Sequence, residues 1–150
     1  MFAYDGSPAA RAAIALAGRH LRPDRDAIVL TVYQPLESVP FFGEAGIVLP
    51  AGADEQIKAE TQRLAEEGAG LARDAGFEAA AVTAHASDGT WETIVAEARK
   101  REASQIVMGT HSRTGVKSAL LGSVATAVMH HAALPVTVVP AAFVEREEQP

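Results

Sequence analysis

An apolar, strand-like run that ends in glycine and leads into a helix is the feature that most constrains this chain. The run is Gln105–Met108, the glycine is Gly109, and the helical segment Val124–Ala132 is opened by Gly122 and Ser123. In α/β proteins such a junction can hold phosphate, because the first amides of a helix lack intrahelical partners and the helix dipole adds positive charge. The Ser123 hydroxyl can cap the helix or donate to a phosphate oxygen. The alternative is a tight strand–helix connection with a capping serine.

Composition limits the class of protein. With 150 residues the chain fits one domain, which we place at 1–142, followed by a charged tail at 143–150. There is no cysteine, so disulfides and thiolate metal sites are excluded. The net charge of −6, with no block of Lys or Arg, argues against nucleic-acid binding. No signal peptide or apolar run of membrane length is present, so we expect no membrane association and a cytoplasmic protein.

Strand-like and helical segments alternate along the chain. Ser7 and Pro8 suit the start of a first helix, Asp54 the start of a second, and Gly76 its end. The expected strands are 1–4, 27–33, 77–86, 105–108 and 134–140. This alternation predicts an α/β fold, a Rossmann-like doubly wound sheet of five parallel strands with helices on both faces. A ligand would lie beyond the carboxyl ends of the strands, where the strand order reverses.

Several sequence blocks together resemble the universal stress protein family. The family signature G-x2-G-x9-G-[ST] is matched by Gly109 and by Gly122–Ser123, with Ser112 in place of the second glycine. Further similar blocks, in the same order, make the resemblance extend over nearly the whole chain. They are Ala3–Pro8, Val29–Val32 and Leu134–Val139.

The resemblance implies that the chain binds ATP, with any Mg²⁺ carried on the phosphates. The residues it implies for the nucleotide site are Ala3, Asp5, Val32, Met108, Gly109, Ser112, Gly122, Ser123 and Val124. Asp5 would contact the adenosine part of the ligand, where a carboxylate can accept from a ribose hydroxyl. It could equally serve as a negative charge at the start of the first helix. Ala3 and Val32 would line the adenine, and both would be plain strand core without a ligand.

The loop between the glycines departs from the family pattern at Ser112. If the second glycine has positive φ, serine there costs about 1–2 kcal/mol and places a Cβ near the phosphates. If φ stays negative, the Ser112 hydroxyl can donate to the ligand instead. Arg113 and Lys117 lie in the same loop, where they could neutralise phosphates or simply be solvated charges.

Neither a metal site nor dedicated enzyme chemistry is legible in the sequence. His130 and His131 are neighbours on a predicted helix and point about 100° apart, so they cannot share one metal. The adenylyl-transferase motif H-x-G-H and the pyrophosphatase loop S-G-G-x-D-S are absent, and no nucleophile elbow occurs. Slow ATP hydrolysis remains open, as some relatives show it.

Two apolar segments suggest protein contacts. The connection 34–53 carries the apolar stretch Phe41–Leu49, and the last strand, Val136 to Val139, is apolar although it should lie at a sheet edge. The edge strand predicts a homodimer, which is how many family members pair. The leading hypothesis is therefore an ATP-binding stress-response regulator that acts as a homodimer. A member without ATP binding that contacts an unknown protein partner is the alternative, and a weak ATPase is the third.

Overall fold

The computed structural model describes residues 1–22, 24–34, 52–110 and 121–140. Five parallel strands form one sheet in the order β3-β2-β1-β4-β5. The strands are β1 (Phe2–Ala3), β2 (Arg25–Tyr33), β3 (Phe77–His85), β4 (Ile106–Gly109) and β5 (Val136–Val139). The predicted doubly wound α/β sheet is confirmed, with β5 at one edge and β3 at the other.

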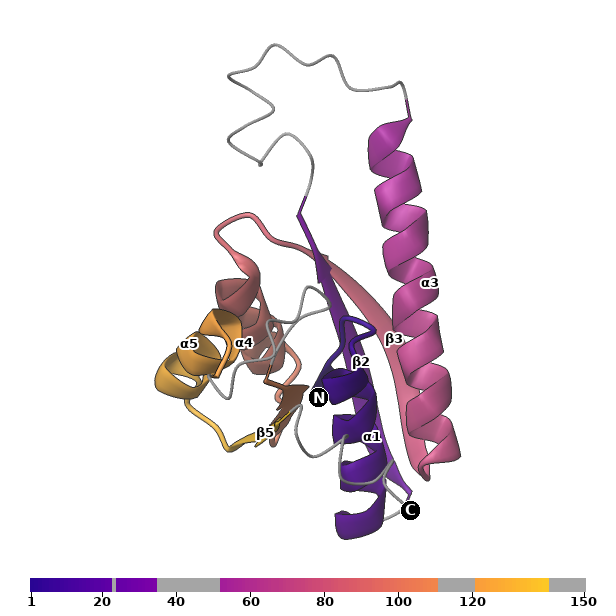
Figure 1. The fold of residues 1–150 in the computed structure, drawn as a ribbon, viewed down its shortest axis with the longest axis vertical. Helices are drawn as coiled ribbons and strands as arrows, with labels where there is room; N and C mark the ends of the chain where they lie inside the picture. Colours follow the sequence, from indigo (N-terminus) through magenta and orange to yellow (C-terminus); the bar gives the residue numbers. More distant parts are fainter. Residues whose placement is uncertain (23, 35–51, 111–120, 141–150) are drawn as a thin grey trace.

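Helices cover both faces of this sheet (Figure 1). The helices of the described residues are α1 (Pro8–His20), α3 (Ala53–Asp74), α4 (Thr90–Lys100) and α5 (Ser123–His131). One apolar core contains residues of α1 and α3, and a second contains residues of α4 and α5. No helix in the described ranges combines the length and the apolar character that crossing a bilayer requires.

Alternation along the strands divides the side chains between the two cores. Phe2 and Val29 pack with Ile14 on the α1/α3 face, and the ring of Phe2 meets that of Phe77 edge-on at 5.3 Å. Leu30 and Ile106 pack on the α4/α5 face. Each face removes apolar side chains from water, which is the main favourable contribution to folding.

The predicted helix caps were partly right. The Ser7 hydroxyl accepts a hydrogen bond from the Ala10 amide at 3.1 Å, and Pro8 is the first residue of α1. The predicted cap at Asp54 is wrong: Gly52 is the N-cap of α3, with φ of +86°, and Asp54 lies in the first turn. Asp54 is still favourable there, because a carboxylate complements the helix dipole. The glycine predicted to end α3, Gly76, follows the helix with φ of +94°.

Element boundaries differ from the expectations by one or two residues. β1 covers Phe2–Ala3 and β5 covers Val136–Val139, so both are shorter than expected, and β2 begins two residues earlier, at Arg25. β3 ends at His85, and α5 covers Ser123–His131. Terminal residues of an element are the least determined by local pattern, because tertiary contacts decide where pairing stops.

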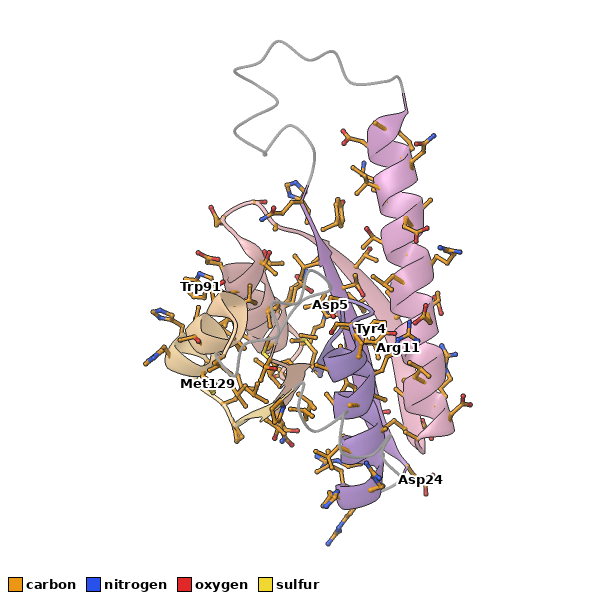
Figure 2. The ribbon with its side chains drawn as sticks, viewed as in Figure 1. Tyr4, Asp5, Arg11, Asp24, Trp91 and Met129 are labelled. Carbon is orange, nitrogen blue, oxygen red and sulfur yellow. The ribbon has the colours of Figure 1, made fainter. Side chains whose placement is uncertain are left out.

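The outer surface of α4 and α5 carries an aromatic stack. The rings of Trp91 on α4 and His131 at the end of α5 lie 4.4 Å apart, inclined by 23°. Met129, which is 43% exposed, lies on the same side of the molecule in Figure 2.

Candidate nucleotide-binding site

The strand order reverses at β1. β1 pairs with β2 on one side and with β4 on the other, so that Ala3 lies between Leu30 and Met108. The carboxyl ends of these three parallel strands therefore meet at one edge of the sheet. This is the position where open α/β sheets bind ligands.

Four of the apolar residues expected at the site share one face of the molecule. Ala3, Val32, Met108 and Val124 all belong to the core cluster between the sheet and α4/α5. Met108 is buried, and the other three are partly exposed. Their placement suits apolar contact with an adenine ring, and it suits an ordinary role in the hydrophobic core equally well.

Gly109, at the end of β4, is a point of close packing. A Cβ added there would lie 2.8 Å from the amide nitrogen of Ala10 and 2.8 Å from the Cβ of Ala9. The first turn of α1 thus packs directly on Gly109. Packing against α1 alone explains a glycine at this position, whether or not a ligand approaches it.

The amides at the start of α5 form the candidate phosphate cradle. Gly122 is the N-cap, and its own amide donates to the Thr110 carbonyl oxygen at 2.9 Å, so this donor is already used. The first intrahelical bond joins the Thr126 amide to the Gly122 carbonyl oxygen. The amides of residues 123–125 therefore have no acceptor within the helix.

The prediction that the Ser123 hydroxyl could cap α5 is wrong, because Ser123 is the first helical residue and the N-cap is Gly122, which has no side chain. A capping hydroxyl must belong to the N-cap residue, and here that residue is a glycine. Ser123 itself is an exposed residue.

Asp5 lies in the turn that joins β1 to α1. One of its carboxylate oxygens, Oδ1, accepts a hydrogen bond from the Ser7 amide at 3.0 Å. The expected role at the start of the helix is therefore present in the structure. This hydrogen bond uses Oδ1, and the carboxylate has a second oxygen, Oδ2.

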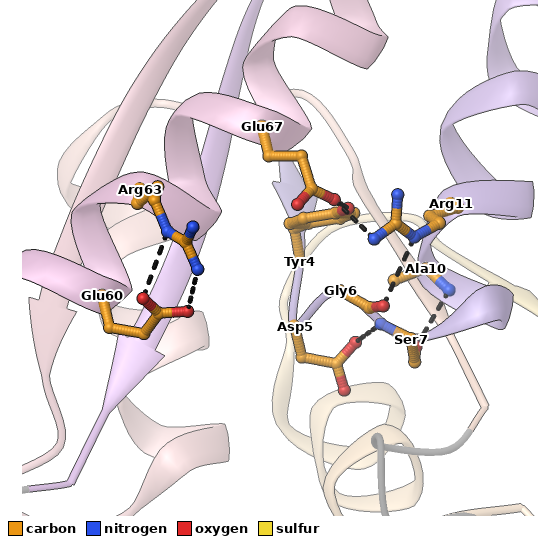
Figure 3. Close-up of polar contacts among 9 residues, drawn as sticks. All are labelled: Tyr4, Asp5, Gly6, Ser7, Ala10, Arg11, Glu60, Arg63 and Glu67. Carbon is orange, nitrogen blue, oxygen red and sulfur yellow. Dashed lines mark hydrogen bonds and ion pairs between the residues drawn. The ribbon is translucent and has the colours of Figure 1, made fainter. Parts of the chain in front are cut away.

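A polar cluster that the sequence reasoning missed lies behind this turn (Figure 3). The buried Tyr4 hydroxyl donates to Glu67 Oε1 at 2.6 Å, and Arg11 Nη2 lies 2.6 Å from the same oxygen. Burial, with the hydrogen bond to Glu67, raises the pKa of Tyr4 above its ordinary value. Glu67 is 63 positions from Tyr4, so no local pattern could have paired them.

Thr110 was also missed. This residue is buried, and its amide donates to the Val139 carbonyl oxygen at 3.0 Å while its carbonyl accepts from Gly122. It thereby ties the end of β4 both to β5 and to the start of α5. In the sequence, only its position directly after Gly109 indicated that Thr110 lies at the candidate site.

Other predicted residues lie outside the described residues: Ser112, Arg113, Lys117, the stretch Phe41–Leu49 and the tail 143–150. Within the described ranges, no three His, Asp or Glu side chains are grouped as a metal ion would require. A groove of about 480 Å³ lies between α1 and α3, lined in part by Ile14 and Leu71, and contains none of the predicted site residues.

Comparisons with known proteins agree with this architecture. The model of the Universal stress protein family matches residues 1–140. A structure of the protein MJ0577 is 28% identical, covers 93% of this chain and 94% of its own, and superposes with a TM-score of 0.63. The universal stress protein from Archaeoglobus fulgidus in complex with dAMP is 21% identical, with 92% and 93% covered and a TM-score of 0.60. A universal stress protein in complex with cAMP is 20% identical, with 93% and 94% covered and a TM-score of 0.55. A search of curated proteins found no match.

Proposed function

Because the chain belongs to the universal stress protein family, we propose that it binds ATP and acts in the cytoplasm as a stress-response regulator rather than as a dedicated enzyme. The observation that carries this proposal is the meeting of three separate parts of the chain at one sheet edge. These are the acidic turn after β1, the apolar face formed with β2 and β4, and the first amides of α5, which have no acceptor within the helix.

Each part suits a different portion of the nucleotide. Ala3 and Val32 would contact the adenine through apolar surface, and Asp5 would accept from a ribose hydroxyl. The amides of Ser123 and Val124 would donate to phosphate oxygens, with the dipole of α5 favouring the negative charge. Any Mg²⁺ would be held mainly by the phosphates, because Mg²⁺ commonly uses phosphate oxygens and water as ligands.

Nucleotide complexes of two structural neighbours support a nucleotide at this fold. One was solved with dAMP and the other with cAMP. Both are adenine nucleotides, although neither is a triphosphate. The triphosphate itself is what the proposal adds for this chain.

Equilibrium dialysis with ATP and Mg²⁺ at physiological salt tests the proposal. We expect saturable binding below millimolar concentration, weakened by about tenfold or more in Asp5→Asn, since a hydrogen bond to a charged group contributes about 1.5–3 kcal/mol. The control is Glu78→Gln, which makes the same charge change at the opposite, amino-terminal end of the strands. Absence of saturable binding by the wild-type protein would reject ATP binding.

The second candidate is a family member that does not bind ATP and instead contacts an unknown protein partner. Ser112 in place of the second signature glycine favours it, because a Cβ there could occupy the space of the phosphates. Adenine absorbance in the purified protein, at 260 nm on the order of that expected for one nucleotide per chain, would count against this candidate. Slow hydrolysis of bound ATP is compatible with the first candidate.

The same proposal includes a homodimer formed through β5. β5 is an edge strand of apolar composition, and such edges normally need charge, a bulge or a partner to prevent uncontrolled association. A second copy paired on this edge would satisfy its outward backbone groups.

A further inference from the structure

The turn that carries Asp5 is held from outside by helix α3. We propose that Glu67 is a positioning residue for the nucleotide site, which fixes the β1–α1 turn so that the Asp5 carboxylate faces the ligand. This inference rests on the proposed nucleotide site, and it adds that a residue of α3, which is distant in sequence, positions part of that site. Its starting observation is that one oxygen of Glu67 binds groups on both sides of the turn.

Hydrogen bonds and an ion pair link Glu67 to the turn (Figure 3). Before the turn, the Tyr4 hydroxyl donates to Glu67 Oε1 at 2.6 Å. After it, Arg11 Nη2 lies 2.6 Å from the same oxygen, and Arg11 Nε donates to the Gly6 carbonyl oxygen at 3.4 Å. Tyr4 directly precedes the turn and Arg11 lies in the first turn of α1, so Glu67 contacts the chain on both sides of the turn.

Packing from the same face of α3 restricts the turn further. Gly6 has φ of +75°, and a Cβ there would lie 2.8 Å from Leu64 Cδ1. One turn along α3, a Cβ at Gly68 would lie 2.7 Å from Cδ1 of the Tyr4 ring. Leu64, Glu67 and Gly68 are spaced as neighbours on one helical face. Together they hold the backbone on both sides of Asp5.

Two other ion pairs of α3 lie within that helix. Arg63 binds both oxygens of Glu60 at 2.7 and 3.1 Å, one turn apart on the same helix and exposed. Glu66 pairs with Arg73, also on α3, at 3.5 Å. Exposed pairs of this kind contribute little. The Glu67–Arg11 pair is about half exposed too, and it differs in its partners: it joins α3 to α1, and the same carboxylate oxygen accepts from the hydroxyl of the buried Tyr4.

The inner contacts of the turn carry this restraint to Asp5. The Asp5 carboxylate accepts from the Ser7 amide, and the Ser7 hydroxyl accepts from the Ala10 amide. Gly6, whose carbonyl is held by Arg11, lies between Asp5 and Ser7. A change at Glu67 therefore reaches the Asp5 side chain through two residues of backbone.

The test compares Glu67→Gln with Glu66→Gln, which removes the same charge from the adjacent position of α3. In the ligand-free protein, we expect Glu67→Gln alone to move the amide NMR signals of Ser7 and Ala10. Hydrogen exchange of the Ser7 amide should become about fivefold faster. By calorimetric titration with Mg·ATP, Glu67→Gln should bind about threefold to tenfold more weakly than Glu66→Gln.

A double-mutant cycle with Asp5→Asn shows whether the effect passes through Asp5. If it does, Glu67→Gln has little further effect on ATP affinity once Asp5 is replaced. The inference would be overturned if Glu67→Gln weakened ATP binding by the same factor with and without Asp5→Asn. It would also be overturned if the amide signals of Glu67→Gln matched those of Glu66→Gln. If the wild-type protein binds no ATP, the proposed function fails, and the amide measurements alone still decide whether Glu67 fixes the turn.

Discussion

At the scale of single residues, Tyr4 combines a packing role with a chemical one. Its ring fills the α1/α3 core, at 3% exposure, against the backbone of Gly68. Its hydroxyl reaches Glu67 at the surface of the molecule. The folded state therefore favours the neutral phenol, because a phenolate would be placed in apolar surroundings and beside a carboxylate.

This preference predicts a loss of stability in alkaline solution. The pKa of Tyr4 is raised by burial and by the hydrogen bond to Glu67, whereas in the unfolded chain it has its ordinary value of about 10. The stabilisation is thus fully present below pH 10 and is lost as the pH rises through the higher value of the folded protein. Urea denaturation between pH 8 and 11.5 should show this decline in the wild-type protein.

In Tyr4→Phe the decline above pH 10 should be smaller, because the group that titrates is gone. At pH 8 the variant should be less stable by about 1 kcal/mol, the usual contribution of one hydrogen bond. Tyr33→Phe is the matched control, since it removes the other tyrosine of the chain. Parallel pH profiles for the wild type and Tyr4→Phe would contradict this account.

At the scale of elements, Gly109 at the end of β4 packs against α1 and also lies at the candidate site. Ala9 and Ala10 approach Gly109 so closely that any side chain would have to displace backbone. The position of α1 then sets the position of the turn before it. Gly109 therefore contributes to the site through packing even before any ligand is considered.

Replacing Gly109 with alanine tests this packing. Gly109 does not have positive φ, so the added methyl acts by contact alone, and we expect destabilisation of about 1–3 kcal/mol in urea. Gly70→Ala is the control: its Cβ would meet nothing within 4 Å, so the helix should gain about 0.5–1 kcal/mol. A Gly109→Ala variant of unchanged stability that no longer binds ATP would assign this glycine to the ligand instead.

Elements were more predictable than their ends or their contacts. Alternating apolar runs and helical periodicity predicted the sheet and its helices, because each strand and helix face must be buried. The caps of α3 and α5 were mispredicted, since the N-cap positions are taken by Gly52, two residues before Asp54, and by Gly122, directly before Ser123. The contact of Glu67 with Tyr4 had no local sequence signal, because only tertiary packing brings α3 beside β1.

At the scale of the whole molecule, the sheet has two edges with different characters. β3 is long and rich in alanine, whereas β5 is short and mostly valine. The carbonyl of Pro135, just before β5, accepts from the Ile106 amide of β4, and the carbonyl of Val139 accepts from the Thr110 amide, just after β4. By the alternation of a β-ladder, the backbone groups of Val136 and Val138 point outward.

Val138→Pro tests the proposed homodimer. Proline removes the outward amide of Val138 but no hydrogen bond to β4, and edge strands tolerate it. Sedimentation should show a dimer for the wild type and for Val138→Ala, and a monomer for Val138→Pro. A monomeric wild-type protein, or a Val138→Pro variant that remains dimeric, would refute pairing through this edge.

The stacked pair on the outer surface gives the protein a built-in optical probe. Trp91 is the only tryptophan of the chain, and it stacks on His131, the last residue of the helix whose first amides form the candidate phosphate cradle. Indole emission responds to a ring stacked directly against it, so a displacement of that helix would alter the fluorescence. Events at one end of α5 can therefore be followed from its other end, with no label attached.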